Sequence, residues 1–487
     1  MSTTQPDETV DVLIVGAGLS GIGAACHLQM KCPKHTVAII EARADLGGTW
    51  DLFRYPGIRS DSDMYTLGYS FKPWVGEKAI ADGPSILQYL RDTAAEYGVD
   101  QRIRFGHRVL RADWSSTDAL WTVEIERDGG ERSTLRCNFL LNCSGYYRYE
   151  AGYTPDFDGI ETFAGQVIHP QQWPEQIDLQ GKRVVVIGSG ATAVTLVPEL
   201  AKLGAAVTLL QRSPTYMVSR PSIDPIARWL LKVGGPRLAH GLTRWKNLLY
   251  GQLVFNLARS RPAKIKARLI GLLREQLPAD YDIATHFTPR YNPWDQRICL
   301  VPDGDLFKAI TQKTVTLVTD QIKRFTPSGI LLKSGAELPA DVVVTATGLQ
   351  VQLSSAMPMR IDGELIDFSK RVGYKGLMFG GVPNFASVFG YTNASWTLKA
   401  DLVCAFVCRM LNHMRSHEQR ICMPQAPSPA MPLLPWIDFS SGYLQRVMDQ
   451  LPKQGTEKPW KLNQNYLKDM LWLRHGSLDD GVMRFSR

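Results

Sequence analysis

Two glycine-rich turns have the residue types and spacing that most directly predict chemistry. They are Gly16-Ala17-Gly18-Leu19-Ser20-Gly21 and Gly188-Ser189-Gly190-Ala191-Thr192-Ala193. In such turns the first glycine permits a tight bend and the second lets the backbone approach a pyrophosphate. The third small residue lets helix and strand pack closely. The phosphates would lie on helix N–H groups, and the Ser20 hydroxyl can also reach one. Each turn therefore predicts a dinucleotide site.

The residue after the second strand of each unit distinguishes the two sites. Glu41 lies 25 residues after Gly16 and would accept hydrogen bonds from ribose hydroxyls. In the second unit Gln211 stands in that place, followed by Arg212 and Ser213. A carboxylate would repel a 2′-phosphate, whereas a guanidinium can hold one bidentately. The alternative is that Arg212 is an ordinary surface arginine. The sequence predicts NADPH rather than NADH at this second site.

Each turn is expected to lie between a buried strand and a helix, because near-continuous apolar runs are typical of parallel strands. We predict strands at 10–15, 37–40, 183–187 and 207–210, and helices at 22–30 and 194–203. Two further short strands, beginning at Phe139 and Val342, end in small-residue turns at Gly145 and Gly348. Such strands commonly carry the chain between two dinucleotide domains. The second domain would thus be inserted into the first.

Length and composition indicate a globular protein of about three units, since domains average about 150 residues. Apolar residues make up 44% of the 487 positions and charged residues 21%, both ordinary for a soluble protein. No run of about 18 apolar residues is present, and the polar start from Met1 to Glu8 shows no secretory signal. The eight cysteines have no metal-site spacing, so no metal is predicted. We expect a cytoplasmic protein with reduced thiols.

The formal net charge of +8 is concentrated in one segment. Residues 220–275 contain twelve Lys or Arg against two acids, a local charge of +10, so the rest of the chain carries −2. Apolar residues recur there at helical spacing, with cations opposite. One interpretation is a solvated basic face on a helical subdomain, and the other is weak association of 220–275 with a membrane surface. Nucleic acid is not expected, because no recognition motif accompanies the charge.

Five motifs spread along the chain carry a family resemblance. They are Phe163-Ala-Gly-Gln-Val-Ile-His169-Pro-Gln-Gln-Trp173, and the segments 47–61, 291–297, 390–396 and 451–455. The first matches the pattern F-x-G-x-x-x-H-x-x-x-W at every fixed position. On these residues the chain resembles class B flavoprotein monooxygenases. It resembles most closely the Baeyer–Villiger monooxygenases of the group that includes the mycobacterial ethionamide-activating enzyme.

The resemblance implies an α/β fold with two Rossmann-like domains, the NADP domain inserted in a discontinuous FAD domain. The FAD domain would comprise 1–150 and 351–487, the NADP domain 151–219 and 290–350, and a basic helical insertion 220–289. It also implies a reaction in which NADPH reduces FAD and the reduced flavin captures O₂ as a C4a-peroxide. That species converts a ketone to an ester or lactone, and its protonated hydroperoxide form oxidises a thioether to a sulfoxide.

Two other activities remain open, and a third is disfavoured by the cysteine spacing. One is an N- or S-oxygenating flavin monooxygenase of the same fold, and another is a membrane-associated flavoprotein that relays electrons. A disulfide reductase would need a redox C-x₄-C pair, and Cys137 and Cys143 are one residue too far apart.

Arg297 and Asp61 match the catalytic pair of the family. A fixed guanidinium stabilises an anion without giving up its proton, and Asp61 would orient it. The alternatives are a structural salt bridge for Arg297 and a turn or N-cap role for Asp61 or its neighbour Asp63. His169 and Trp173 belong to the linker motif, for which the resemblance implies a positional role near the nicotinamide; the alternative for His169 is ordinary packing.

The remaining matches concern the flavin. The resemblance places a run of five residues along the flavin phosphate and ring edge, and a backbone contact to adenine at Val109. The run consists of Gly48, Thr49, Trp50, Asp51 and Leu52. Trp396 is a candidate pocket wall or plain core. The chain departs from the family at Gln296, where many members have a lysine that grips the NADPH phosphate. This departure puts cofactor affinity in question.

Overall fold

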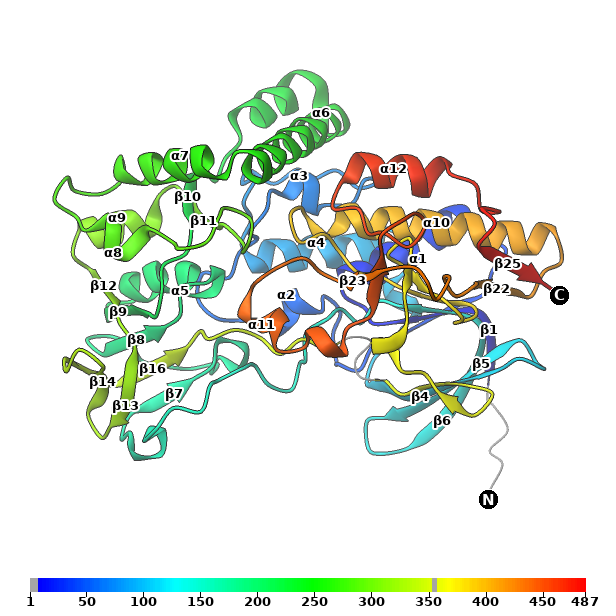
Figure 1. Ribbon diagram of the computed structural model, residues 1–487, viewed down its shortest axis with the longest axis horizontal. Coiled ribbons are helices and arrows are strands. Elements are labelled where there is room, and N and C mark those ends of the chain that lie inside the picture. The colour runs from blue at the N-terminus through cyan, green and yellow to red at the C-terminus, as the bar shows by residue number, and fades with distance from the viewer. Residues whose placement is uncertain (1–7, 353–356) are drawn as a thin grey trace.

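The computed structural model describes residues 8–352 and 357–487, in which two sheets with parallel strands lie side by side (Figure 1). The first has the strand order β18-β17-β4-β5-β6-β1-β2-β3, and β21 pairs with β6. Strands β1, β2, β3 and β21 run parallel to their neighbours, and β4, β5 and β6 form an antiparallel meander. The bounds are β1 Glu8–Val15, β2 Val37–Ile40, β3 Ile103–Arg104, β4 His107–Ser115, β5 Leu120–Arg127, β6 Arg132–Asn142, β17 Met359–Ile361, β18 Glu364–Leu365 and β21 Phe385–Ser387.

The second sheet is wholly parallel, with the order β12-β9-β8-β16-β7. A small antiparallel sheet, β13-β14-β15, and a parallel pair, β10-β11, flank it. The bounds are β7 Gln166–Ile168, β8 Arg183–Ile187, β9 Ala206–Gln211, β10 Met217–Arg220, β11 Cys299–Pro302, β12 Val315–Thr319, β13 Ile322–Thr326, β14 Gly329–Leu332, β15 Glu337–Pro339 and β16 Val342–Thr345.

The chain leaves the first sheet after β6 and returns to it only at β17, so the second sheet is inserted into the first unit. The two crossing segments pair with each other through a bridge between Tyr147 and Val351. The Arg148 amide also donates to the Gln350 carbonyl at 2.9 Å. The predicted fold class is confirmed, and every predicted strand and helix of the two units is present. The exact domain boundaries stay predictions.

Helices cover both sheets. Figure 1 shows α1 and α10 on the upper side of the first sheet with α12 beyond them, and α5, α8 and α9 on the second unit. In β1, Val12 and Ile14 belong to the core under α1 and α10, whereas Leu13 and Val15 face the opposite core, as expected for a strand buried on both sides. The helices are α1 Leu19–Lys31, α2 Thr49–Leu52, α3 Met64–Leu67, α4 Gly83–Glu96, α5 Ala191–Lys202, α6 Pro225–Ser260, α7 Pro262–Arg274, α8 Ile283–Phe287, α9 Asp305–Thr311, α10 Trp396–Ser416, α11 Gly442–Gln445 and α12 Tyr466–His475.

Each glycine-rich turn packs closely against the end of a neighbouring strand, the first against β6 and the second against β16. A Cβ at Gly16 (φ +99°) would lie 2.8 Å from the Cys143 carbonyl oxygen, just beyond β6. A Cβ at Gly188 (φ +139°) would lie 2.4 Å from the Ala346 carbonyl oxygen, just beyond β16. At Gly21 the clash would be with the Gly16 carbonyl, at 1.8 Å. Because a Cβ at any of these three positions would clash with backbone atoms, only glycine fits there.

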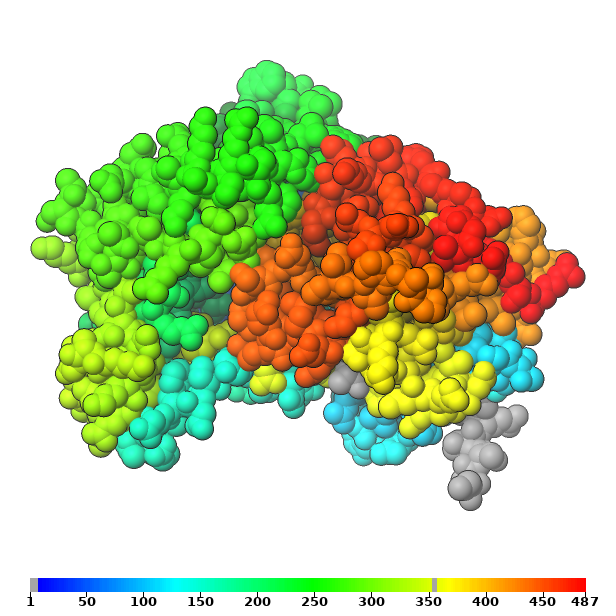
Figure 2. All heavy atoms as spheres, in the orientation of Figure 1, coloured from blue at the N-terminus to red at the C-terminus, as the bar shows by residue number. Residues whose placement is uncertain are grey.

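The basic segment forms α6, kinked at Gly235, and α7. In Figures 1 and 2 the green α6 stands out from the upper edge of the molecule. Its inner side is attached by Arg244, which donates to the carbonyl oxygens of Tyr65 and Gly68 and pairs with buried Asp401. Among the helices of residues 8–352 and 357–487, none is long and apolar enough to cross a membrane.

His240 on α6 predicts a specific pH dependence of stability. Burial, aided by the charge of Arg244, lowers the pKa of His240 from 6.5 to about 4. Between about pH 6.5 and pH 4, His240 is therefore protonated in the unfolded chain but neutral in the folded chain. The free energy of unfolding should fall by roughly 3 kcal/mol between pH 7 and pH 4 through this group alone. We expect His240→Gln to reduce the difference between the melting temperatures at the two pH values. An unchanged difference would contradict the assignment.

Candidate functional site

The first glycine-rich turn opens α1 and lies against the segment that follows β2. The Gly47 amide donates to the Ala17 carbonyl at 3.0 Å, and a Cβ on Gly48 would lie 3.0 Å from Gly18 Cα. Glu41 is buried, and its carboxylate accepts hydrogen bonds from the Ala17 and Arg43 amides at 2.7 and 2.9 Å. Burial raises the pKa of Glu41. This close, side-chain-free approach fits a dinucleotide pyrophosphate, with Glu41 at the ribose end.

Ser20 lies within this turn and is buried. Its Oγ accepts a hydrogen bond from Trp396 Nε1 at 2.8 Å, and the Trp396 ring stacks on Tyr146 at 5.0 Å. Trp396 is half-buried at the start of α10. Its contacts with Ser20 and Tyr146 connect the first turn to the segment that follows β6.

The residues that were predicted to lie along the edge of the flavin form α2 and Gly48, the residue before it. Asp51 is buried and accepts hydrogen bonds from Arg43 and Arg54. Trp50 packs against the cores of both units, so this short helix lies at the junction between them. Thr49 and Leu52 are half-buried in α2, and Val109 is half-buried in β4 opposite Ile125.

The second turn is more open than the first. A Cβ on Gly190 would meet nothing within 4 Å. Arg212 and Ser213 are exposed at the end of β9, where Ser189 Oγ donates to the Ser213 carbonyl at 3.1 Å. Gln211 is buried and its amide donates to the His286 carbonyl and to Thr319 Oγ1. The side chain that replaces the ribose-binding acid thus points away from the turn, and an exposed guanidinium is left beside it. Ala191 and Thr192 begin α5 and Ala193 is buried in it.

Arg297 and Asp61 form an ion pair that spans the two units. Arg297 precedes β11 of the second unit, and Asp61 lies in the loop after α2 of the first. Their side chains remain 37% and 45% exposed. Asp61, together with neighbouring tyrosines, raises the pKa of Arg297 well above its usual range, so the guanidinium stays charged. Asp63, the neighbour weighed against Asp61, instead caps α3 by accepting the Thr66 amide at 3.0 Å.

Residues close to Arg297 contact elements of both turns. Tyr146, which stacks on Trp396, lies close enough to Arg297 that the guanidinium opposes the burial-driven rise in the pKa of that phenol. On the other side, Cys299 Sγ, two residues after Arg297, donates to the Ser189 carbonyl at 3.8 Å. The cation therefore lies between the two predicted dinucleotide sites.

The loop that carries Arg297 is strained. Trp294 has φ +71°, a left-handed conformation that is unusual for a bulky residue. Its ring packs on Phe255 of α6 at 5.6 Å, and Arg259 of α6 pairs with Asp295 at 3.0 Å. These contacts hold the strained loop in place, and with it the position of Arg297. Gln296, which stands where many family members have lysine, is half-buried in the same loop.

His169 links the two crossing segments. Its Nε2 lies 3.1 Å from the Gly348 carbonyl, and its Nδ1 accepts the Gln171 amide at 3.1 Å. A Cβ on Gly152 would lie 1.8 Å from the His169 ring. Burial lowers the pKa of His169, so the ring is neutral with Nε2 protonated. Trp173 packs half-buried against the core of the second unit. This geometry suits a positional role where the chain passes between units.

Sequence reasoning missed three tyrosines around Arg297. Tyr146 and Tyr147 follow β6 and their hydroxyls are 2.6 Å apart, and Tyr443 comes from α11. Two aromatic residues directly after a small-residue turn at a strand end could have been noticed for the first pair. Nothing in the sequence pointed to Tyr443, which lies 146 positions after Arg297.

Two dinucleotide turns in two units, one inserted into the other, with a charged arginine between them, define a two-dinucleotide oxidoreductase. Family models agree: a "Flavin-binding monooxygenase-like" model matches residues 79–355, and an "NAD(P)-binding Rossmann-like domain" model matches residues 14–74. The chain is 53% identical to FAD-containing monooxygenase EthA of Mycobacterium tuberculosis, covering 99% of this chain and 98% of that one. It is 47% identical to a probable FAD-binding monooxygenase, AlmA, of Acinetobacter, covering 99% and 97%.

Among solved structures, an oxidised steroid monooxygenase bound to NADP matches with a TM-score of 0.71 at 25% identity, covering 86% of this chain and 88% of that one. An open cyclohexanone monooxygenase matches with a TM-score of 0.72 at 23% identity, covering 86% and 90%, and supports the fold. The chain belongs to the flavin-binding monooxygenase-like family.

Proposed function

We propose that the protein is an FAD-containing, NADPH- and O₂-dependent Baeyer–Villiger monooxygenase that converts ketones to esters or lactones and also oxidises thioethers to sulfoxides. The observation that carries the proposal is the position of Arg297, connected through Tyr146 and Trp396 to the first turn and through Cys299 to the second. A fixed cation at that place can act on a substrate that meets both cofactors. The family membership and the NADP-bound structural relative support the same reading.

Each cofactor is assigned to its own set of residues. Bound FAD, once reduced by the nicotinamide, would supply the activation of O₂. We assign FAD to Gly16, Gly18, Ser20, Gly21, Glu41, Gly48, Thr49, Trp50, Asp51, Leu52, Asp61 and Val109. We assign NADPH to Gly188, Ser189, Gly190, Ala191, Thr192, Ala193, Arg212 and Ser213, with His169 and Trp173 positioning the nicotinamide end.

Arg297 supplies electrostatic stabilisation where the substrate reacts. Negative charge develops on the carbonyl oxygen of a ketone when the carbonyl carbon is attacked, and a preorganised guanidinium lowers the free energy of that state. Asp61 keeps the guanidinium oriented, and Tyr146, Tyr147 and Tyr443 lie near enough to influence its pKa. Because the pKa of Arg297 is raised, the group holds its proton throughout.

The proposal is tested with purified, FAD-loaded protein and NADPH in air. Cyclohexanone, a linear methyl ketone and methyl phenyl sulfide are supplied separately, and products are identified by mass. Ester or lactone from a ketone supports Baeyer–Villiger activity. Sulfoxide without any ester indicates the N- or S-oxygenating alternative. NADPH consumption that yields only hydrogen peroxide with every substrate indicates an electron-relay flavoprotein and refutes the proposal.

We also propose that the protein associates peripherally with an anionic membrane through α6. Nine large apolar side chains on this helix are 43–61% exposed. Five of them, Leu238, Leu242, Trp245, Leu249 and Leu253, recur at helical spacing and form the α6 apolar face. Exposed cations lie near its two ends, at Arg237 and Arg261. Apolar residues, tryptophan and surrounding cations together favour the surface of an anionic bilayer.

Vesicle sedimentation tests this association. We expect the protein to pellet with vesicles containing phosphatidylglycerol at low salt, less at high salt, and not with pure phosphatidylcholine, because the attraction is screened. Leu249→Glu together with Leu253→Glu should abolish pelleting. The control is Leu203→Glu, an equally exposed leucine at the end of α5. A concentration-dependent dimer without vesicle binding would instead assign the α6 apolar face to a second copy of the chain.

A further inference from the structure

The loop from Phe53 to Asp61 belongs to the first unit by sequence but packs on the second. Phe53, Tyr55 and Ile58 are buried in the core of the second unit. Gly57 (φ +75°) approaches α5 so closely that a Cβ would lie 2.3 Å from Glu199 Cγ. This loop is therefore a direct packing contact between the first unit and the core of the second.

Two ion pairs join the end of this loop to the second unit. Asp61 pairs with Arg297, and two residues earlier Arg59 pairs with Asp305 through contacts of 2.5 and 3.4 Å. The Arg59 and Asp305 side chains are only 13% and 16% exposed. Their paired N–H to oxygen contacts have the fork geometry that fixes orientation as well as distance.

The two pairs are mechanically connected on both sides. In the first unit, Ser60 lies between Arg59 and Asp61, and its amide donates to the Ala81 carbonyl at 3.0 Å. In the second unit, Arg297 and Asp305 flank β11, which is hydrogen-bonded along its length to β10. A displacement of Arg59 relative to Asp305 would therefore also displace Asp61 relative to Arg297.

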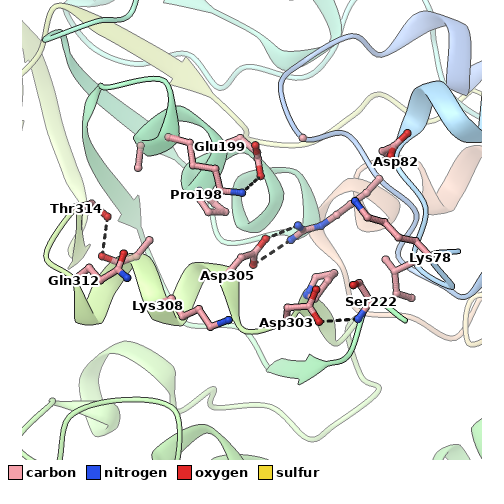
Figure 3. A pocket seen from close by; sticks show the side chains of 17 residues that line it. Lys78, Asp82, Pro198, Glu199, Ser222, Asp303, Asp305, Lys308, Gln312 and Thr314 are labelled. Atoms are coloured by element: carbon pink, nitrogen blue, oxygen red, sulfur yellow. Dashed lines mark hydrogen bonds and ion pairs between the residues drawn. The ribbon is translucent and has the colours of Figure 1, made fainter. Parts of the chain in front are cut away.

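The Arg59–Asp305 pair borders a cavity of about 800 Å³ between the two units. Figure 3 shows Asp305 directed into this cavity, with Lys308 on one side and Asp303 and Ser222 on the other. The Lys78 side chain also lines it. Asp82, Glu199 and Asp303 line the same space as Lys78 and Lys308, so loss of the Asp305 charge would leave Arg59 in polar surroundings without its paired carboxylate. The loop would then lose the charge-assisted contact that fixes its orientation on the second unit.

We infer that Arg59 and Asp305 are positioning residues that hold the Asp61–Arg297 pair in register across the two units. The inference rests on the proposed function, because Arg297 is the group being positioned. Errors of about 1 Å in a reacting group cost up to about 10²-fold in rate, so a partly buried ion pair at this place has a measurable effect on turnover.

Asp305→Asn tests the inference in the FAD-loaded enzyme with cyclohexanone. We expect kcat to fall about tenfold while KM for NADPH changes less than about twofold, and a larger share of NADPH to yield hydrogen peroxide. Hydrogen exchange should become faster at the Ser60 and Gly83 amides, which donate to Ala81 and Ile58 in the same loop contact. The exchange readout does not depend on activity.

A charge reversal and a matched control complete the experiment. Arg59→Glu combined with Asp305→Arg should recover most of the loss, because the pair is restored with opposite polarity. Asp341→Asn breaks the Arg183–Asp341 pair inside the second unit and should leave kcat, coupling and Ser60 exchange unchanged. Wild-type turnover, coupling and exchange in Asp305→Asn would overturn the inference even if melting temperature falls. If the wild-type enzyme makes no ester, the proposed function itself fails.

Discussion

Replacing Arg297 with alanine should lower the rate of ester or lactone formation by about 10²–10³-fold, the usual effect of removing a preorganised group that stabilises a developing oxyanion. NADPH should still be consumed, because Arg297 lies outside both glycine-rich turns. The consumed NADPH should appear as hydrogen peroxide. Product yield per NADPH, measured with cyclohexanone by product mass and peroxide assay, checks this result.

Arg297→Lys is the matched control for charge. Lysine keeps a cation but lacks the planar fork that meets Asp61, so its rate should lie between those of the wild type and the alanine variant. Asp61→Asn should behave like a weaker form of Arg297→Ala, because it leaves the guanidinium in place but no longer oriented by a charge. Ester formation at the wild-type rate in Arg297→Ala would remove Arg297 from the catalytic machinery.

Replacing Arg212 with alanine should raise KM for NADPH roughly 10- to 100-fold and leave KM for NADH nearly unchanged. A hydrogen bond to a charged partner contributes about 1.5–3 kcal/mol, and the 2′-phosphate that would accept it is present only in NADPH. The structure strengthens this expectation because Arg212 is exposed beside the second turn while Gln211 is turned into the core. Gln296 offers no second cation in the Arg297 loop.

Steady-state kinetics with both nicotinamides measure the effect. The control is Arg324→Ala, which removes an exposed cation from β13 in the small flanking sheet. It tests whether any loss of positive charge from the second unit weakens NADPH binding. An Arg212→Ala enzyme that keeps its preference for NADPH would show that Arg212 is a surface residue. The specificity would then have to come from Ser213 and backbone groups.

The sequence by itself determined the two dinucleotide units and their order. A Cβ at Gly21 would strike the Gly16 carbonyl within the same turn, a clash that local strand-turn-helix geometry already implies, whereas Gly16 and Gly188 meet the distant Cys143 and Ala346 carbonyls. The linker motif and the Arg297 loop could be placed by resemblance. The acid-to-glutamine change at 211 also predicted cofactor preference, because the end of a βαβ strand has a fixed position relative to its own turn.

Only the tertiary structure decided which distant side chains meet. The sequence offered no reason to place Tyr443 beside Arg297, or to pair Arg59 of the first unit with Asp305 of the second. It showed that the segment 220–275 is basic, but not that five apolar residues of α6 face solvent while Arg244 and His240 face the core. Such contacts depend on how separately folded units dock. Docking is fixed by the summed packing of many residues, whereas a turn is fixed by the covalent geometry of a few.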